Sequence, residues 1–150
     1  MRKTRTRYRY GIQLEIDMII DAYIRVVGAE DTIQAIHKET SAANARVKRL
    51  KARRGELGED NWWDWGTEPT RLDTEKPDDG IKAILQKYRP IFPAISKHAA
   101  DADIYLEIVA RYSGNDEPRG MCFSAETVQL IGELGAAVDI DVVPSVRDRV

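Results

Sequence analysis

Cysteine is nearly absent from this sequence. Cys122 is the only one, so the chain cannot form an intramolecular disulfide, and this fits the reducing cytoplasm. Long apolar runs are missing too: none approaches the roughly 20 residues that a membrane-spanning helix needs. The basic N-terminus, MRKTRTRYRY, precedes no apolar segment of the kind found in secretory signals. We therefore predict a cytoplasmic protein that makes no membrane contact.

Signatures of catalysis are equally scarce. His37 and His98 have no partners at metal-ligand or general-base spacing, so each is expected on the surface of its helix. The sequence contains no Cys–His pair, no GxSxG motif and no phosphate-binding loop. Cys122 lies in an apolar stretch and is expected to be buried. We expect no cofactor, and an enzyme is less favoured than a binding protein.

The composition is that of a soluble globular domain. The chain has 150 residues, of which 43% are hydrophobic and 32% charged, with a formal net charge of −2. This length suits one domain with a substantial core. We divide the chain into an N-terminal extension at residues 1–17, a single domain at 18–143 and a C-terminal tail at 144–150.

The clearest local pattern lies at residues 119–143, which read as strand, helix and strand. Apolar residues recur at helical spacing after Ser124, a good N-cap, and Gly135 suits a left-handed C-cap. The period then changes to two. One face of the last strand is predicted to point into the core, and it carries Val138, Ile140 and Val142. The strand at 119–123 is predicted to form an antiparallel hairpin with a strand at 104–110.

The earlier elements follow from similar patterns. Residues 1–17 alternate as an extended arm or edge strand, with Tyr8, Tyr10, Ile12, Leu14 and Ile16 on one face. A strand is expected at 19–27, a helix at 30–39, and a strand at 61–66 that pairs with the preceding segment as a hairpin. The segment 41–54 fits either helix or strand. A helix capped by Asp78 or Asp79 meets Pro90 and Pro93, which predict a kink or two helices near Arg89.

These elements predict an α+β fold. It is a two-layer sandwich, in which helices pack on one face of a mostly antiparallel sheet. The helix-free face would carry Asp139, Asp141, Glu107 and Tyr105.

Two short motifs carry a resemblance to a known family. Leu134-Gly135-Ala136 followed by Asp139-Ile140-Asp141 resembles the C-terminal signature of the bacterial domain of unknown function 4279 family. Ala22 to Gly28 resembles its first strand more weakly, so the resemblance covers roughly Met18 to Val143. It implies a small α+β domain, favours a strand within 41–54 and assigns no settled activity. Some such proteins are regarded as candidate immunity proteins of bacterial toxin systems.

Three tryptophans form the first candidate binding site. On a strand, Trp63 and Trp65 share one face and Trp62 takes the other. Exposed tryptophan is enriched at binding hot spots and on base-stacking platforms. The simpler interpretation is that the three rings pack in the core, and Trp62 is the one expected to point outward.

Two basic segments, 2–9 and 46–54, form the second candidate. The first contains Arg2, Lys3, Arg5, Arg7 and Arg9, and the second contains Arg46, Lys48, Arg49, Lys51, Arg53 and Arg54. With nearby aromatic residues they resemble a nucleic-acid footprint. Charge runs are more often solvated surface, and an acidic protein would suit them equally well.

Asp139 and Asp141 form the third candidate. Two positions apart on a strand, their carboxylates lie on one face about 7 Å from each other. They could share a divalent cation or a catalytic water, although a solvated strand face is the commoner reason for such alternation.

The preferred hypothesis is a small cytoplasmic binding module that acts through protein–protein contacts. An immunity-type protein with a toxin as its partner is one version of it. The candidate binding residues are Trp62, Trp63, Trp65, Arg46, Lys48 and Arg49. The alternatives are a nucleic-acid-binding protein that uses segments 2–9 and 46–54, and a metal-dependent enzyme centred on Asp139 and Asp141. The oligomeric state stays open.

Overall fold

The computed structural model describes residues 5–9, 12–16, 18–41, 44–50, 62–112 and 120–144. The elements are β1 (Arg5–Arg9), β2 (Ile12–Ile16), β3 (Met18–Ala29), α1 (Glu30–Thr40), β4 (Arg46–Arg49), β5 (Trp62–Gly66), β6 (Thr70–Arg71), α2 (Pro77–Tyr88), the 3₁₀ helix η1 (Arg89–Ile91), α3 (Phe92–His98), β7 (Asp103–Tyr112), α4 (Ala125–Leu134) and β8 (Ala137–Pro144). Among the described residues, none of the helices has the length and apolar character that crossing a membrane requires.

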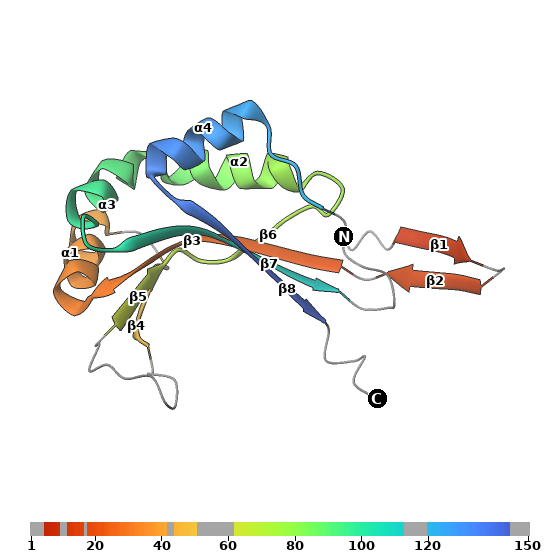
Figure 1. Cartoon of the computed structure of the whole chain (residues 1–150), viewed down its shortest axis with the longest axis horizontal. Helices are drawn as coiled ribbons and strands as arrows, with labels where there is room; N and C mark the ends of the chain where they lie inside the picture. The colour runs from red at the N-terminus through yellow and green to blue at the C-terminus, as the bar shows by residue number, and fades with distance from the viewer. Residues whose placement is uncertain are drawn as a thin grey trace.

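The main sheet has six strands. Their order is β4-β5-β3-β7-β8, and the short β6 pairs with β3 beside this path. Neighbours pair antiparallel except β7 and β8, which run parallel. The helices all lie on one side of this sheet (Figure 1). The predicted α+β architecture, with helices on one face of a mostly antiparallel sheet, is therefore confirmed.

The central strand β3 shows why the sheet has a helix-covered face and an open one. Its even-numbered residues from Ile20 to Val26 are buried, whereas the odd-numbered residues between them are only half-buried. Facing residues of β7 repeat the pattern, because Leu106 and Ile108 are fully buried opposite Ile24 and Ala22. The helices cover this apolar face.

The prolines divide the second helical segment as predicted. α2 ends at Tyr88, η1 contains Pro90, and α3 starts at Phe92 with Pro93 in its first turn. Proline lacks the N–H that an interior helical position donates, but the first turn of a helix does not need it. The start of α2 differs from the prediction. Pro77 occupies the first turn, and Lys76, rather than Asp78 or Asp79, is the N-cap residue.

Both predicted caps of α4 are confirmed. The Ser124 hydroxyl accepts a hydrogen bond from the backbone N–H of Thr127 at 3.2 Å. Gly135 has a φ of 72°, and its N–H donates to the carbonyl of Gly132 at 3.0 Å. Asp78 adds a contact from α2, since its carboxylate accepts from the backbone N–H of Ser124. Partial burial opposes the shift, but the Ser124 and Thr127 hydrogen bonds hold the pKa of Asp78 below its ordinary value.

The strand expected at 119–123 is wrong for the residues that the structure describes there, 120–123, which have no strand conformation. The edge of β7 where this strand would pair is occupied by β8 instead. Met121 and Phe123 are partly buried against the core, while Cys122 between them is exposed. The prediction that Cys122 is a buried residue is therefore also wrong.

The prediction that β8 turns its apolar residues into the core needs a similar correction. Val138, Ile140 and Val142 are 38%, 44% and 46% exposed. Their register places them beside Leu106, Ile108 and Ala110 on the helix-covered face. The face assignment was correct, but the burial was not, because β8 is an edge strand that the helices leave uncovered.

The N-terminal segment is a hairpin, which we call the arm, and not a single alternating strand. β1 and β2 pair antiparallel with Arg7 opposite Leu14. They form a two-stranded sheet of their own that projects from one end of the main sheet (Figure 1).

Candidate binding surface on the open sheet face

The face of the main sheet opposite the helices, which we call the open face, is rich in polar residues. Strand alternation and register place five groups of residues on it: Arg46 and Lys48 of β4, Trp62 and Asp64 of β5, Asp21, Tyr23 and Arg25 of β3, Tyr105, Glu107 and Arg111 of β7, and Asp139 and Asp141 of β8. Charged residues of both signs therefore lie in adjacent rows.

Arg25 lies at the centre of this face. Its Nε donates to Asp64 Oδ2 at 3.0 Å, and its Nη1 donates to Glu107 Oε1 at 3.3 Å. The side chains of Asp64 and Glu107 are only 10% and 9% exposed. Two largely buried carboxylates from the neighbouring strands thus hold the guanidinium between them.

Glu107 has only part of its charge balanced. Burial is the largest influence and raises the pKa of its carboxyl group above the ordinary value. Asp139 raises it further, Arg25 opposes the shift, and Asp141 adds a smaller upward effect. Its second oxygen, Oε2, is buried and has no hydrogen-bond partner within the described structure. Glu107 therefore favours its protonated form more than an exposed glutamate does.

A second cluster lies further along β3. Asp21 accepts from Arg71 Nε at 2.8 Å and from Arg111 Nη1 at 3.2 Å. Both arginines are more than half exposed, so these pairs order the surface more than they stabilise the fold.

The three tryptophans have three different environments. Trp65 is fully buried under α1, and Trp63 is partly buried on the same face. Trp62 lies on the open face and is 41% exposed. The predicted split between Trp62 and the other two is confirmed. Of the three tryptophans, only Trp62 exposes a large part of its ring to solvent.

Basic residues of β4 lie along the strand that pairs with β5. The guanidinium of Arg46 lies 5.7 Å from the centre of the Tyr23 ring, a cation–π contact. Lys48 is 66% exposed, and its Nζ lies 3.9 Å from Asp64 Oδ2. Arg49 pairs with Trp63 in the strand register. Of these three residues, only Lys48 is diagonally next to Trp62 on the open face, because Arg46 lies opposite Gly66 and Arg49 shares the helix-covered face with Trp63.

The structure does not bring the two predicted basic segments together. β1 contains Arg5, Arg7 and Arg9 and belongs to the arm, whereas β4 is the far edge strand of the main sheet. The two strands lie at opposite ends of the molecule (Figure 1). Residues 2–4 and 51–54 lie outside the described residues.

Asp139 and Asp141 lie on the open face, as predicted, opposite Glu107 and Val109. Both aspartates are exposed. Within the described ranges, no group of three or more histidine, cysteine, aspartate or glutamate residues is arranged to hold a metal ion. The described geometry thus supplies no observation in favour of the metal hypothesis.

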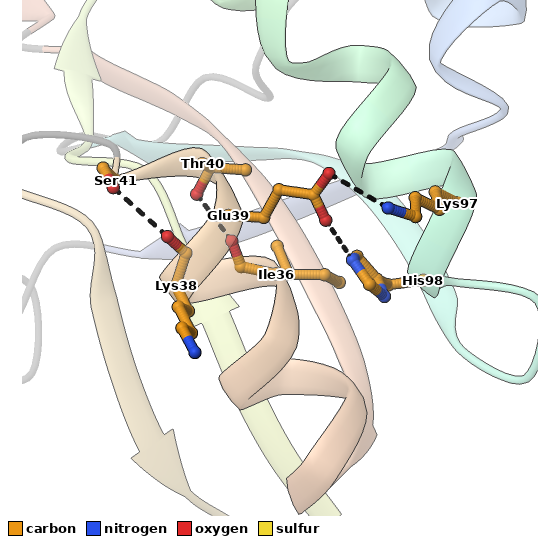
Figure 2. Close-up of polar contacts among 7 residues, drawn as sticks. All are labelled: Ile36, Lys38, Glu39, Thr40, Ser41, Lys97 and His98. Atoms are coloured by element: carbon orange, nitrogen blue, oxygen red, sulfur yellow. Dashed lines mark hydrogen bonds and ion pairs between the residues drawn. The ribbon is translucent and has the colours of Figure 1, made fainter.

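The histidines belong to the helical layer. Figure 2 shows His98 of α3 in contact with Glu39 at the end of α1, and Lys97 Nζ lies 3.4 Å from the same carboxylate. The His98 contact is the main cause that lowers the pKa of Glu39. Thr40 and Ser41 donate to backbone carbonyls of the same turn (Figure 2). Glu39 therefore joins α1 to α3, and this cluster has a structural explanation.

The sequence matches one known protein family. A family model described as Domain of unknown function (DUF4279) matches residues 15–145. The chain belongs to the DUF4279 family. No curated protein and no solved structure matches it. The DUF4279 match includes all six strands of the main sheet and all four α-helices, but leaves β1 and most of β2 outside.

In this DUF4279 domain, sequence reasoning missed the central ion-paired cluster. Arg25 and Asp64 were not candidates, although a signal was present. In β3, the polar residues Asp21, Tyr23 and Arg25 alternate with Ala22 and Ile24, a pattern that predicts one polar face. The partners of Arg25 could not be read from the chain, because they depend on which strands are neighbours.

Proposed function

We propose that this protein is a non-catalytic binding module whose protein partner contacts the open face around Trp62, Arg46 and Lys48. The observation that carries the proposal is the exposed Trp62 ring on the open face, with Lys48 as its diagonal neighbour on β4 and Arg46 further along the same strand. Tryptophan and arginine are the residues most enriched where binding energy concentrates. Strands also hold such residues more firmly than loops do.

The charges indicate the chemistry of the partner. Arg46 and Lys48 suit an acidic segment, while the Trp62 ring suits an apolar or proline side chain next to it. Because Asp64 and Glu107 are neutralised in part by Arg25, they repel such a segment less than isolated carboxylates would. We place this module in the cytoplasm, and an immunity-type role with a toxin enzyme as the partner is the version that the resemblance favours.

The experiment compares three purified variants in pull-downs from the source cell and then in calorimetry with the recovered partner. Trp62→Ala and Lys48→Glu are expected to weaken binding, with Trp62→Ala costing about 2 kcal/mol, roughly 30-fold in Kd. Val128→Ala is the matched control, since Val128 is a 56% exposed apolar residue on the helical layer. A partner that binds all three variants as tightly as the parent would rule out this surface.

Nucleic acid is the second candidate, because an exposed tryptophan with a lysine next to it can also stack on bases. The acidic residues of the same face, Asp139 and Asp141 among them, disfavour phosphate. Filter binding with single- and double-stranded oligonucleotides separates the two proposals. Affinity that falls steeply with salt and is lost in Lys48→Glu would favour nucleic acid, and no binding at low salt would exclude it.

A further inference from the structure

β8 is an edge strand with an exposed apolar side. β7 pairs along one side of it, and no strand in the described part of the chain pairs along the other. Val138, Ile140 and Val142 are exposed on the same stretch. An edge strand presents unpaired N–H and C=O groups and is a template for another strand. Three aliphatic side chains beside these groups add apolar area that a further strand would bury.

The charges of β8 restrict which strand can add there. Asp139 and Asp141 alternate with the aliphatic residues, so the other face of the strand is acidic. Antiparallel pairing with a second β8, centred on Ile140, would place Asp139 of one copy opposite Asp141 of the other. Like charges in directly opposite positions are destabilising. The best complement is a strand with a basic residue at every second position.

β1 has this pattern. It reads Arg5-Thr6-Arg7-Tyr8-Arg9, so arginine recurs at every second residue. β1 pairs only with β2 among the described strands, and an isolated two-stranded sheet is marginally stable in water. The other edge of the main sheet is no alternative, because β4 contains Arg46, Lys48 and Arg49 and would repel β1.

We propose that β1 of one copy adds to the outer edge of β8 of a second copy. In an antiparallel register with Tyr8 opposite Ile140, Arg9 comes opposite Asp139 and Arg7 opposite Asp141. Each copy has one arm and one β8 edge, so two copies exchange arms in a closed twofold dimer. This contact uses neither Trp62 nor β4 and is independent of the surface proposed for the protein partner.

The test reverses charge on one side of the contact at a time in the full chain. The arm variant carries Arg5→Glu, Arg7→Glu and Arg9→Glu, and the edge variant carries Asp139→Lys and Asp141→Lys. Sedimentation of the parent from about 1 to 100 µM is expected to show a monomer–dimer equilibrium. Each variant alone should weaken the dimer about tenfold or more. Circular dichroism checks that both variants stay folded.

The most specific test is whether combining the two charge reversals restores the dimer. An equimolar mixture of the two variants has two opposite-charge contacts per heterodimer and should dimerise as the parent does. A single chain with both reversals should also dimerise. In hydrogen exchange, the amides of residues 137–143 should exchange more slowly with rising concentration in the parent but not in the arm variant.

Two results would overturn the proposal. The first is a parent that is monomeric at about 100 µM, and the second is a dimer that neither charge reversal weakens. In the first case, a foreign protein that binds the parent and not the edge variant would show that β8 pairs with a strand of another molecule.

Discussion

Glu107 shows how a single residue can hold a neighbouring side chain and still carry a folding cost. Its carboxyl group accepts from Arg25, yet it is buried, has one oxygen without a partner in the described structure, and lies opposite Asp139. Burial first, and the two aspartates after it, raise its pKa despite Arg25. A group whose pKa is higher in the folded than in the unfolded state stabilises the fold at low pH and loses that contribution as the pH rises through the folded value.

The effect of Glu107→Gln on protein stability should therefore depend on pH. Glutamine resembles the protonated acid and still offers Arg25 a carbonyl oxygen. We expect the variant to gain stability relative to the parent as the pH rises from about 4, near the pKa of an unfolded glutamate, to about 7. Urea unfolding at the two pH values measures this difference. The control is Asp103→Asn, an exposed acid at the start of the same strand. The opposite trend would mean that the Arg25 ion pair outweighs burial.

The helix α4 has one glycine inside it and one at its C-terminal end, and the two have opposite roles. Gly132 lies inside the helix, while Gly135 ends it in the left-handed conformation. A Cβ atom added to either would meet nothing within 4 Å, so packing does not decide the outcome. Backbone conformation alone should decide it.

Gly132→Ala should stabilise the protein by about 0.5–1 kcal/mol, because glycine loses more conformational freedom than alanine in a helix. Gly135→Ala should destabilise it by about 1–2 kcal/mol, because alanine at a φ of 72° is strained. Urea unfolding of the two variants side by side gives the two free energies. Changes of the same sign would show that α4 does not end at Gly135 in solution.

Helix ends were easier to predict than strand partners for a physical reason. Ser124, Gly135, Pro90 and Pro93 act within one turn of the chain, so their effect is visible in the sequence. Pairing depends on residues far apart. The apolar run at 121–123 fitted a strand, but the strand that pairs with this edge of β7 is β8, which follows α4 in the chain.

For the whole molecule, alternation predicted the faces of strands such as β5 and β8, but it did not predict their burial. Val138, Ile140 and Val142 occupy the expected face and are exposed, because burial depends on whether a helix lies above that part of the sheet. The candidate site, too, could be predicted only in part. Trp62 was identified as outward from alternation, whereas the cluster around Arg25 required the order of the strands.

The arm should be separable from the fold, because β1 and β2 form their own sheet. Deleting residues 1–17 should leave the circular dichroism spectrum of the main sheet in place and change the free energy of unfolding of the monomer by less than about 1 kcal/mol. Trp65→Ala removes a fully buried ring and should lower the free energy of unfolding by about 3–5 kcal/mol. It is the control for a defect in the core, measured in the same assay.

The protein concentration decides what this deletion measures. A dimer stabilises the folded state by mass action, so the deleted chain should lose stability against the parent only at concentrations where the parent dimerises. Thermal unfolding at low and high concentration separates the two effects. A loss that is equally large at low concentration would mean that the arm belongs to the fold of the single chain, since only contacts within one chain survive dilution.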